Sequence, residues 1–408
     1  MNLFQKGMFN TGLALNYMFY AILNMTLITG LPNSYVSGGI RCVILGIAVV
    51  LFFLDFQRGQ YGKFPISVWA FAAFWIYFSI ILLKEPSMHF LLSADYIGAQ
   101  GGKLYYAYIL YIASFGIFLL LFCGRDRLNY LIDHPMVTWG ACVAGVLGIL
   151  YVNRGAMSTF SLLDSSNEYA NRSIVKATMG PLFAVSLYMF LFQAKNLKHS
   201  IPGFLGCLLA GLNLMISDSK SAIVSFFCIA LFYLAYSIVH MRSILWIGMV
   251  YVVSAIFILP YLFMSKSWER LSQLSGYEEM YLRGDEELSR FDMIMNGFHR
   301  FASSPVFGDG IYAQDGSSGC HFLPLEILVP TGLIGAFFML FVFWGMFRGM
   351  LYILKTNPVS LWVLGVCVWD LSQQFFHGYT FTLFCLSTGF LLAADCARKN
   401  SKALMRRF

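Results

Sequence analysis

The residues best suited to do chemistry in this chain are basic side chains that stand beside long apolar stretches. Arg172, Lys220 and Arg290 have few carboxylates close to them in the sequence, and Arg300 follows on the same segment as Arg290. A guanidinium group at such a boundary suits a phosphate or pyrophosphate, because its fork of donors can hold two oxygens at once. We therefore expect these four cations to bind a pyrophosphate, and a lipid-linked pyrophosphate would match both the charge and the apolar surroundings.

Arg290 and Arg300 belong to the one long polar segment of the chain, residues 265–322. A polar segment of this length between apolar stretches is a common place for the chemistry of a membrane enzyme. Its run LSRFDMIMNGFHRFA predicts a short amphipathic helix, because apolar residues recur at helical spacing. The residues of this stripe are Phe291, Ile294, Met295, Phe298 and Phe301.

The polar segment continues with SSPVFGDG and closes with His321. Pro305 should end the amphipathic helix, because a proline disfavours helical angles in the residue before it. Gly308 and Gly310 then permit a tight turn. His321 stands at the mouth of the next apolar stretch.

Composition indicates a polytopic membrane protein. The chain is 59% hydrophobic and 12% charged, and its mean hydropathy is +0.69, which excludes an ordinary soluble domain. A bilayer core of ~30 Å needs about twenty apolar residues per helix, so the sequence predicts an all-α protein with about twelve transmembrane helices. Their expected limits are residues 9–29, 36–54, 65–83, 104–122, 136–152, 174–192, 202–216, 221–239, 243–264, 323–346, 358–376 and 380–395.

Basic residues predict the orientation of these helices. With the N-terminus in the cytoplasm, most short inner connections and the tail ARKNSKALMRRF carry Lys or Arg. We then expect one membrane domain over residues 1–408, with the loop 265–322 on the outer side between the ninth and tenth helices. The net charge of +7 needs no nucleic acid, because basic residues anchor the inner face near anionic membrane lipids. The first apolar stretch lacks a small-residue cleavage site, so we expect no removed signal peptide.

Further polar residues are candidates for lining a binding cavity. Asp370, Gln373, Gln374 and His377 share one helical face that runs out to the external surface. Such a face rarely points at lipid, so these residues either line a cavity or join helices through hydrogen bonds. Arg154 and Glu168, on an earlier outer loop, are candidates of the same kind or simply solvated. The cysteines show no metal-binding spacing and no disulfide framework, and we expect neither a metal nor another cofactor.

These pieces together resemble the O-antigen polymerase and ligase superfamily. The likeness rests on SDSKSA before an apolar stretch, Arg290, the run from Ser304 to Gly310, His321 and LEILVPTGLIG, in that order. It covers roughly residues 150–345 and is strongest from 288 to 335. The chain departs from the usual pattern in two places. Lys220 stands where the family usually has Arg, and Phe322 stands where Asn commonly follows the His.

The resemblance implies a metal-independent glycosyl transfer on the periplasmic face of a bacterial inner membrane. The donor would be a glycan on undecaprenyl pyrophosphate, and a sugar hydroxyl of the acceptor would attack its anomeric carbon. Arg290, Arg172 and Lys220 would stabilise the departing pyrophosphate. The residues that would bind the glycan are Arg154, Glu168, Asp370 and Gln374. His321 would accept the proton of the acceptor, since an ordinary histidine titrates near pH 6.5; the alternative is that His321 only caps the next helix.

Three functions fit the sequence. A Wzy-like polymerase, favoured by LEIL followed by Gly332 and Gly335, would add the lipid-linked glycan to a lipid-linked repeat unit and would have a chain-length regulator as a candidate partner. A WaaL-like ligase would hand the glycan to lipid A core by the same chemistry. A flippase for lipid-linked oligosaccharides would also have about twelve helices, but it needs no long outer loop, and the two halves of the chain show no internal repeat.

Overall fold

The computed structural model describes residues 2–15, 34–57, 64–84, 125–152, 179–216, 220–239, 245–252, 290–310, 322–356, 361–377 and 380–405. Every regular element in these ranges is a helix, which confirms the predicted all-α class. Residues 3–15 and 245–252 form short helical stretches. The remaining helices are α2 (Ser34–Gln57), α3 (Ile66–Lys84), α6 (Arg125–Asp133), α7 (Pro135–Val152), α10 (Gly180–Phe192), α11 (Leu197–Ile216), α12 (Lys220–Val239), α16 (Arg290–Ser303), α17 (Leu323–Thr356), α18 (Leu361–His377) and α19 (Thr380–Met405).

Several of these helices coincide with predicted transmembrane segments. α2, α3, α7, α12 and α18 begin and end within a few residues of the limits expected from the sequence. Within the described ranges, one helix, Leu323–Lys355, is long and apolar enough to cross a membrane by length and composition. The number of twelve spans stays a prediction, because the expected span 104–122 and parts of others lie outside the described residues.

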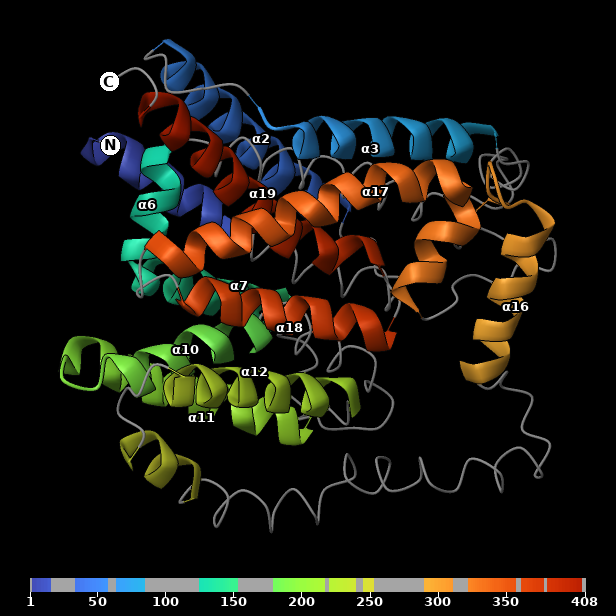
Figure 1. Cartoon of the computed structure of the whole chain (residues 1–408). Coiled ribbons are helices and arrows are strands. Elements are labelled where there is room, and N and C mark those ends of the chain that lie inside the picture. Colours follow the sequence, from blue (N-terminus) through green and yellow to red (C-terminus); the bar gives the residue numbers. More distant parts are fainter. Residues whose placement is uncertain are drawn as a thin grey trace, which may run out of the picture.

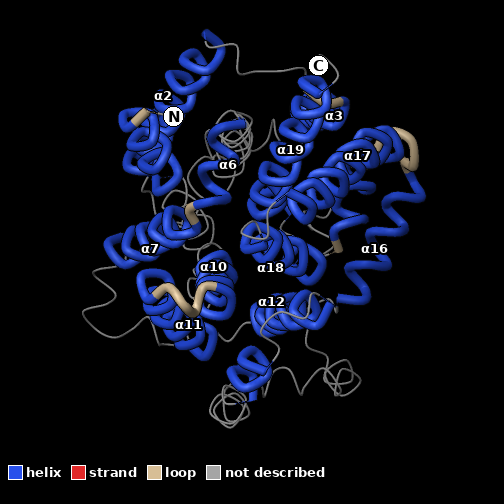
Figure 2. Tube along the Cα trace, turned by 60° about the vertical axis from the view of Figure 1, so that its left-hand side comes forward, coloured by secondary structure: helices blue, strands red, loops and turns tan. Residues whose placement is uncertain are grey.

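α18 forms the centre of the bundle. It packs against α10, α12, α17 and α19, which surround it in Figure 2. Its residues from Leu361 to Cys367 are all buried, and the indoles of Trp362 and Trp369 are fully enclosed. A helical segment that is apolar on every side, as α18 is from Leu361 to Trp369, belongs in the interior of a bundle.

The bundle has two distinct ends, seen at the left and the right of Figure 1. Both chain termini and α6 lie at one end, which we call the termini end. At the opposite end α16 runs across the ends of the other helices instead of along them, and we call this the α16 end. Chain ends on the same side agree with an even number of membrane crossings.

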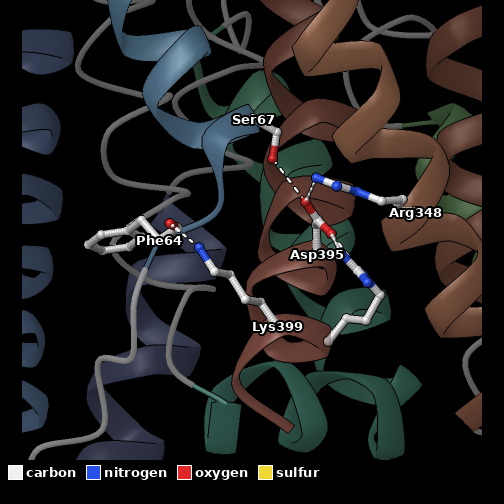
Figure 3. Close-up of polar contacts among 6 residues, drawn as sticks. Phe64, Ser67, Arg348, Asp395 and Lys399 are labelled. Atoms are coloured by element: carbon white, nitrogen blue, oxygen red, sulfur yellow. Dashed lines mark hydrogen bonds and ion pairs between the residues drawn. The ribbon is translucent and has the colours of Figure 1, made fainter. Parts of the chain in front are cut away.

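Buried ion pairs hold the helices together toward the termini end. The carboxylate of Asp395 on α19 accepts hydrogen bonds from Ser67 Oγ on α3 and from the guanidinium groups of Arg348 and Arg398 (Figure 3). Asp395 is completely buried. Lys399 donates to the carbonyl of Phe64, 2.9 Å away. The network therefore ties α3, α17 and α19 into one unit.

A second buried pair joins α2 to α6. The guanidinium of Arg127 contacts the carboxylate of Asp55 and donates to the carbonyl of Leu51 at 2.6 Å. Only 1% of the Arg127 side chain is exposed. The structure thus pairs Arg127, like Arg348 and Arg398, with a carboxylate inside the protein.

Candidate functional site

A sharp break in α17 shapes the α16 end. The backbone of Gly332 has φ 60° and ψ −160°, a conformation open to glycine alone, and Pro330 stands two residues before it. The segment from Leu323 to Thr331 therefore turns away from the straight part of α17 (Figure 1). We call the corner from Val329 to Ile334 the elbow.

The turn formed by residues 304–310 is bonded directly to the elbow. The backbone N–H of Asp309 donates to the carbonyl of Val329 at 2.7 Å. In return, Leu333 donates to Pro305 at 2.8 Å and Ile334 to Val306 at 3.3 Å. The break leaves backbone groups of α17 without their helical partners, and the turn supplies those partners.

Glycines make this close approach possible. A Cβ added to Gly308 would lie 2.5 Å from the backbone nitrogen of Thr331, and one added to Gly332 would lie 2.6 Å from the nitrogen of Gly308. Gly308 and Gly310 have φ of 86° and 83°, which confirms the predicted tight turn. The run from Ser304 to Gly310, which carries part of the family resemblance, thus brings the backbone of the turn against the backbone of α17.

α16 confirms the predicted amphipathic helix, and part of its apolar stripe packs on α17. Ile294 and Phe301 contact a small core around Leu325 and Val329, to which Phe322 also belongs. The other flank of the stripe is open, since Met295 is 40% and Phe298 49% exposed. The turn at the C-terminal end of α16 fixes the direction of the helix, which runs from the α12 side of the bundle to the α3 side (Figures 1 and 2).

An aromatic layer underlies the α16 end. The Trp369 ring on α18 meets Phe226 of α12 edge-on with centroids 5.2 Å apart, and Phe226 stacks on Phe183 of α10 at 4.1 Å. Gly180 lies so close to the Trp369 indole that a Cβ there would fall inside the ring. Just beyond this layer, Ser372 Oγ donates to Ser225 Oγ at 2.7 Å. These contacts fix where α10 and α12 begin.

Two of the predicted pyrophosphate ligands stand at the first residues of helices at this end. Lys220 is the first residue of α12, and the Ser225–Ser372 contact places that part of α12 beside the C-terminal part of α18. Arg290 is the first residue of α16. Gln374 lies near the end of α18. Lys220 and Arg290 are predicted to share one site, for which Gln374 is a further candidate, and the structure brings the helices that carry them to the same end of the bundle.

Several predicted site residues lie outside the described residues. They are Arg154, Glu168, Arg172 and His321. The residue after His321, Phe322, packs beside α16, as described above. The roles of these four residues stay predictions.

Arg300 and Asp370 make specific contacts within the protein. Arg300 Nε donates to Asp309 Oδ2 at 2.9 Å, and its Nη2 donates to the Gly310 carbonyl at 3.1 Å. Asp370 is buried, and its carboxylate accepts hydrogen bonds from the backbone N–H and the hydroxyl of Ser387 on α19. These bonds join α18 to α19, which corresponds to the second of the two roles that the sequence left open for Asp370.

Sequence reasoning missed two residues that hold the α16 end together. Asp309 bonds both Arg300 and the elbow, and Tyr77 on α3 donates its hydroxyl hydrogen to the Phe307 carbonyl at 2.9 Å. The carboxylate between two glycines in GDG, close after Arg300, is a signal that could have revealed the first. No local signal reveals the second, because Tyr77 comes from a distant helix.

Within the described ranges, no three His, Cys, Asp or Glu side chains lie close enough together to hold a metal ion. Metal independence stays a prediction.

A comparison with known protein families found a match to part of the chain. Residues 205–342 match a family described as O-antigen ligase (Wzy_C). The matched range runs from α11 to the straight part of α17 and so includes α12, α16 and the elbow. This match confirms the predicted resemblance to the O-antigen polymerase and ligase superfamily, a group of bacterial membrane glycosyltransferase-like enzymes that use lipid-linked oligosaccharides. A search of curated proteins found no match.

Proposed function

We propose that the chain is a polysaccharide polymerase of the bacterial inner membrane, because its residues 205–342 match an O-antigen ligase family. The proposed enzyme transfers a glycan from undecaprenyl pyrophosphate to the sugar of an incoming lipid-linked repeat unit. The transfer takes place at the α16 end, which faces the periplasm. The family match carries this proposal, since the matched residues include the helices that begin with Lys220 and Arg290.

The leaving group sets the main physical demand on the site. When the anomeric carbon parts from its phosphate oxygen, negative charge builds up on the pyrophosphate. Preorganised cations aimed at that charge lower the barrier, and a bidentate guanidinium is the strongest single donor that a side chain offers. In our proposal Arg290 holds two pyrophosphate oxygens, and Lys220 and Arg172 supply further positive charge.

Attack by the acceptor completes the reaction. The hydroxyl oxygen of the acceptor sugar forms a bond to the anomeric carbon, and the hydroxyl proton passes to His321. A histidine with an ordinary pKa near 6.5 is largely neutral at pH 7 and can take that proton. Undecaprenyl pyrophosphate leaves, and the product is a glycan longer by the donor's sugars. No metal enters this scheme.

A ligase is the second candidate, because the matched family is described by that activity. The same cations and the same base would serve, and only the acceptor differs: lipid A core instead of a lipid-linked repeat unit. The family match does not distinguish a lipid-linked repeat unit from lipid A core as the acceptor. The acceptor therefore has to be identified by experiment.

The glycan phenotype of a deletion strain separates the functions. If the chain is the polymerase, the strain should carry lipid A core capped with a single repeat, and complementation with Arg290→Ala should leave that phenotype unchanged. Bare core with lipid-linked polymer accumulating would identify a ligase. Single lipid-linked units stranded on the cytoplasmic face would indicate a flippase and contradict glycosyl transfer.

A further inference from the structure

We propose that Arg300 and Asp309 are positioning residues for the proposed transfer. Their ion pair fixes the turn 304–310 on the elbow and so determines where α16, which begins with Arg290, lies across the α16 end. This inference rests on the proposed role of Arg290. It gives Arg300 a different task from the pyrophosphate ligand that its position in the sequence suggested.

The guanidinium of Arg300 is directed into the turn. Its Nε and Nη2 reach two different groups there, the carboxylate of Asp309 at 2.9 Å and the carbonyl of Gly310 at 3.1 Å. Only 11% of the Arg300 side chain is exposed. A rigid fork that bonds two points of one turn fixes both its position and its orientation.

Asp309 links α16 to α17 directly. Its side chain accepts from Arg300 on α16, while its backbone N–H donates to Val329 on α17 at 2.7 Å. Tyr77 ties the same turn to α3 through the Phe307 carbonyl. Three helices therefore meet on seven consecutive residues of the chain, 304–310.

Among the described side chains, the apolar contact between α16 and α17 is a small cluster around Leu325 and Val329, against which Ile294, Phe301 and Phe322 pack. Apolar contacts are non-directional, so a small patch permits sliding and rotation. Hydrogen bonds are directional, and the bonds of the turn therefore set the register of α16.

Electrostatics also argue against a direct role of Arg300 in anion binding. The Asp309 carboxylate neutralises the guanidinium locally, and 39% of the Asp309 side chain is exposed. A pyrophosphate that approached Arg300 would meet a negative charge at contact distance.

The variant Asp309→Asn separates the two roles, because positioning predicts a change in kcat and pyrophosphate binding predicts a change in the donor KM. If the pair positions α16, the variant should lower kcat by about tenfold, because a small misplacement of a reacting group is costly, and leave the donor KM within about twofold of wild type. Arg300→Lys should act in the same direction, and the double variant should be no worse than either single one. If Arg300 binds pyrophosphate, Asp309→Asn should leave kcat unchanged and lower the donor KM, and that result would overturn the proposal. His299→Gln, at a neighbouring exposed position of α16, is the matched control and should retain wild-type kcat.

A distance measurement tests the inference without any substrate. Spin labels at Met295 on α16 and Leu354 on the straight part of α17 occupy exposed positions. Pulsed electron resonance on the full chain in nanodiscs should give one narrow distance distribution, which broadens or shifts in Asp309→Asn and not in His299→Gln. An unchanged distribution would refute the positioning role. If the distribution broadens but wild type transfers no glycan, the proposed function fails while the positioning role stands.

Discussion

Replacing Gly332 by alanine should disrupt the elbow, because the added methyl group would clash with the backbone of the turn. The Cβ would press on the backbone of Val306 and lie 2.6 Å from the nitrogen of Gly308. All of these are backbone atoms of the docked turn, so no side chain can rotate out of the way. The backbone angles at Gly332, φ 60° and ψ −160°, are also strained for any residue with a Cβ.

The cost can be estimated from the two ways in which the protein could respond. Keeping the turn in place costs about 1–3 kcal/mol of backbone strain, before the steric contact is added. Releasing the turn gives up three backbone hydrogen bonds, at about 0.5–1.5 kcal/mol each. Either response should destabilise the α16 end by roughly 2–5 kcal/mol.

Two assays check this estimate. The melting temperature of Gly332→Ala in detergent should fall by several degrees. Limited proteolysis should cut near the turn faster than in wild type, since local opening becomes easier. Gly140→Ala in α7 is the control, because it is a helical glycine with open space around its Cβ, and it should be neutral or stabilising by about 0.5–1 kcal/mol. If Gly332→Ala melted and was cleaved like wild type, the described elbow would be wrong.

Three further predictions concern other parts of the molecule. Arg290→Lys should slow transfer about ten- to a hundredfold, because lysine keeps the charge but loses one charge-assisted bond; a normal glycan chain-length distribution at equal expression would argue against bidentate binding. Asp395→Asn should lower the melting temperature, because it removes the charged acceptor shared by Ser67, Arg348 and Arg398. Turnover per folded molecule should stay unchanged, since the network lies away from the α16 end, and a loss of turnover with normal stability would contradict this. Burial and nearby His134 hold the pKa of His199, just before the predicted span 202–216, below its ordinary value, so the stability that His199 contributes is present above pH 6.5 and is lost as pH falls below it. The melting temperature of His199→Gln should therefore depend less on pH between 7.5 and 5.5 than that of wild type. Equal pH dependence would refute the assignment.

Local features of the α16 end could be predicted from the sequence, because their signals are local. The apolar stripe that contains Ile294 and Phe301 predicted α16, and Pro305 predicted where that helix ends. Gly308 and Gly310 predicted the turn that follows. The break at Gly332 could not be predicted in this way. A Pro-Thr-Gly run inside an apolar stretch is compatible with a continuous helix, and the break becomes favourable only when the turn 304–310 supplies hydrogen bonds to it.

The roles of charged residues were harder to predict, since a charge in the sequence does not show its partner. Arg300 is predicted to bind an anion, and the structure gives it Asp309 of the following turn as a partner. Arg127 counts in the sequence only as one basic residue of an inner connection, and the structure buries it against Asp55 from another helix. Asp370 was left between lining a cavity and joining helices, and its bonds to Ser387 now join α18 to α19. In each case the partner is set by packing, which periodicity and charge counts do not describe.

The most direct test of the account is glycosyl transfer by the purified protein. The full chain in nanodiscs is given a synthetic glycan on undecaprenyl pyrophosphate, with either a lipid-linked repeat unit or lipid A core as acceptor. We predict longer lipid-linked glycans with the first acceptor, release of undecaprenyl pyrophosphate in equal amount, and loss of both products in Arg290→Ala. Transfer only to lipid A core would replace the polymerase with a ligase. No transfer to either acceptor by protein that is folded by its melting curve would contradict the central claim.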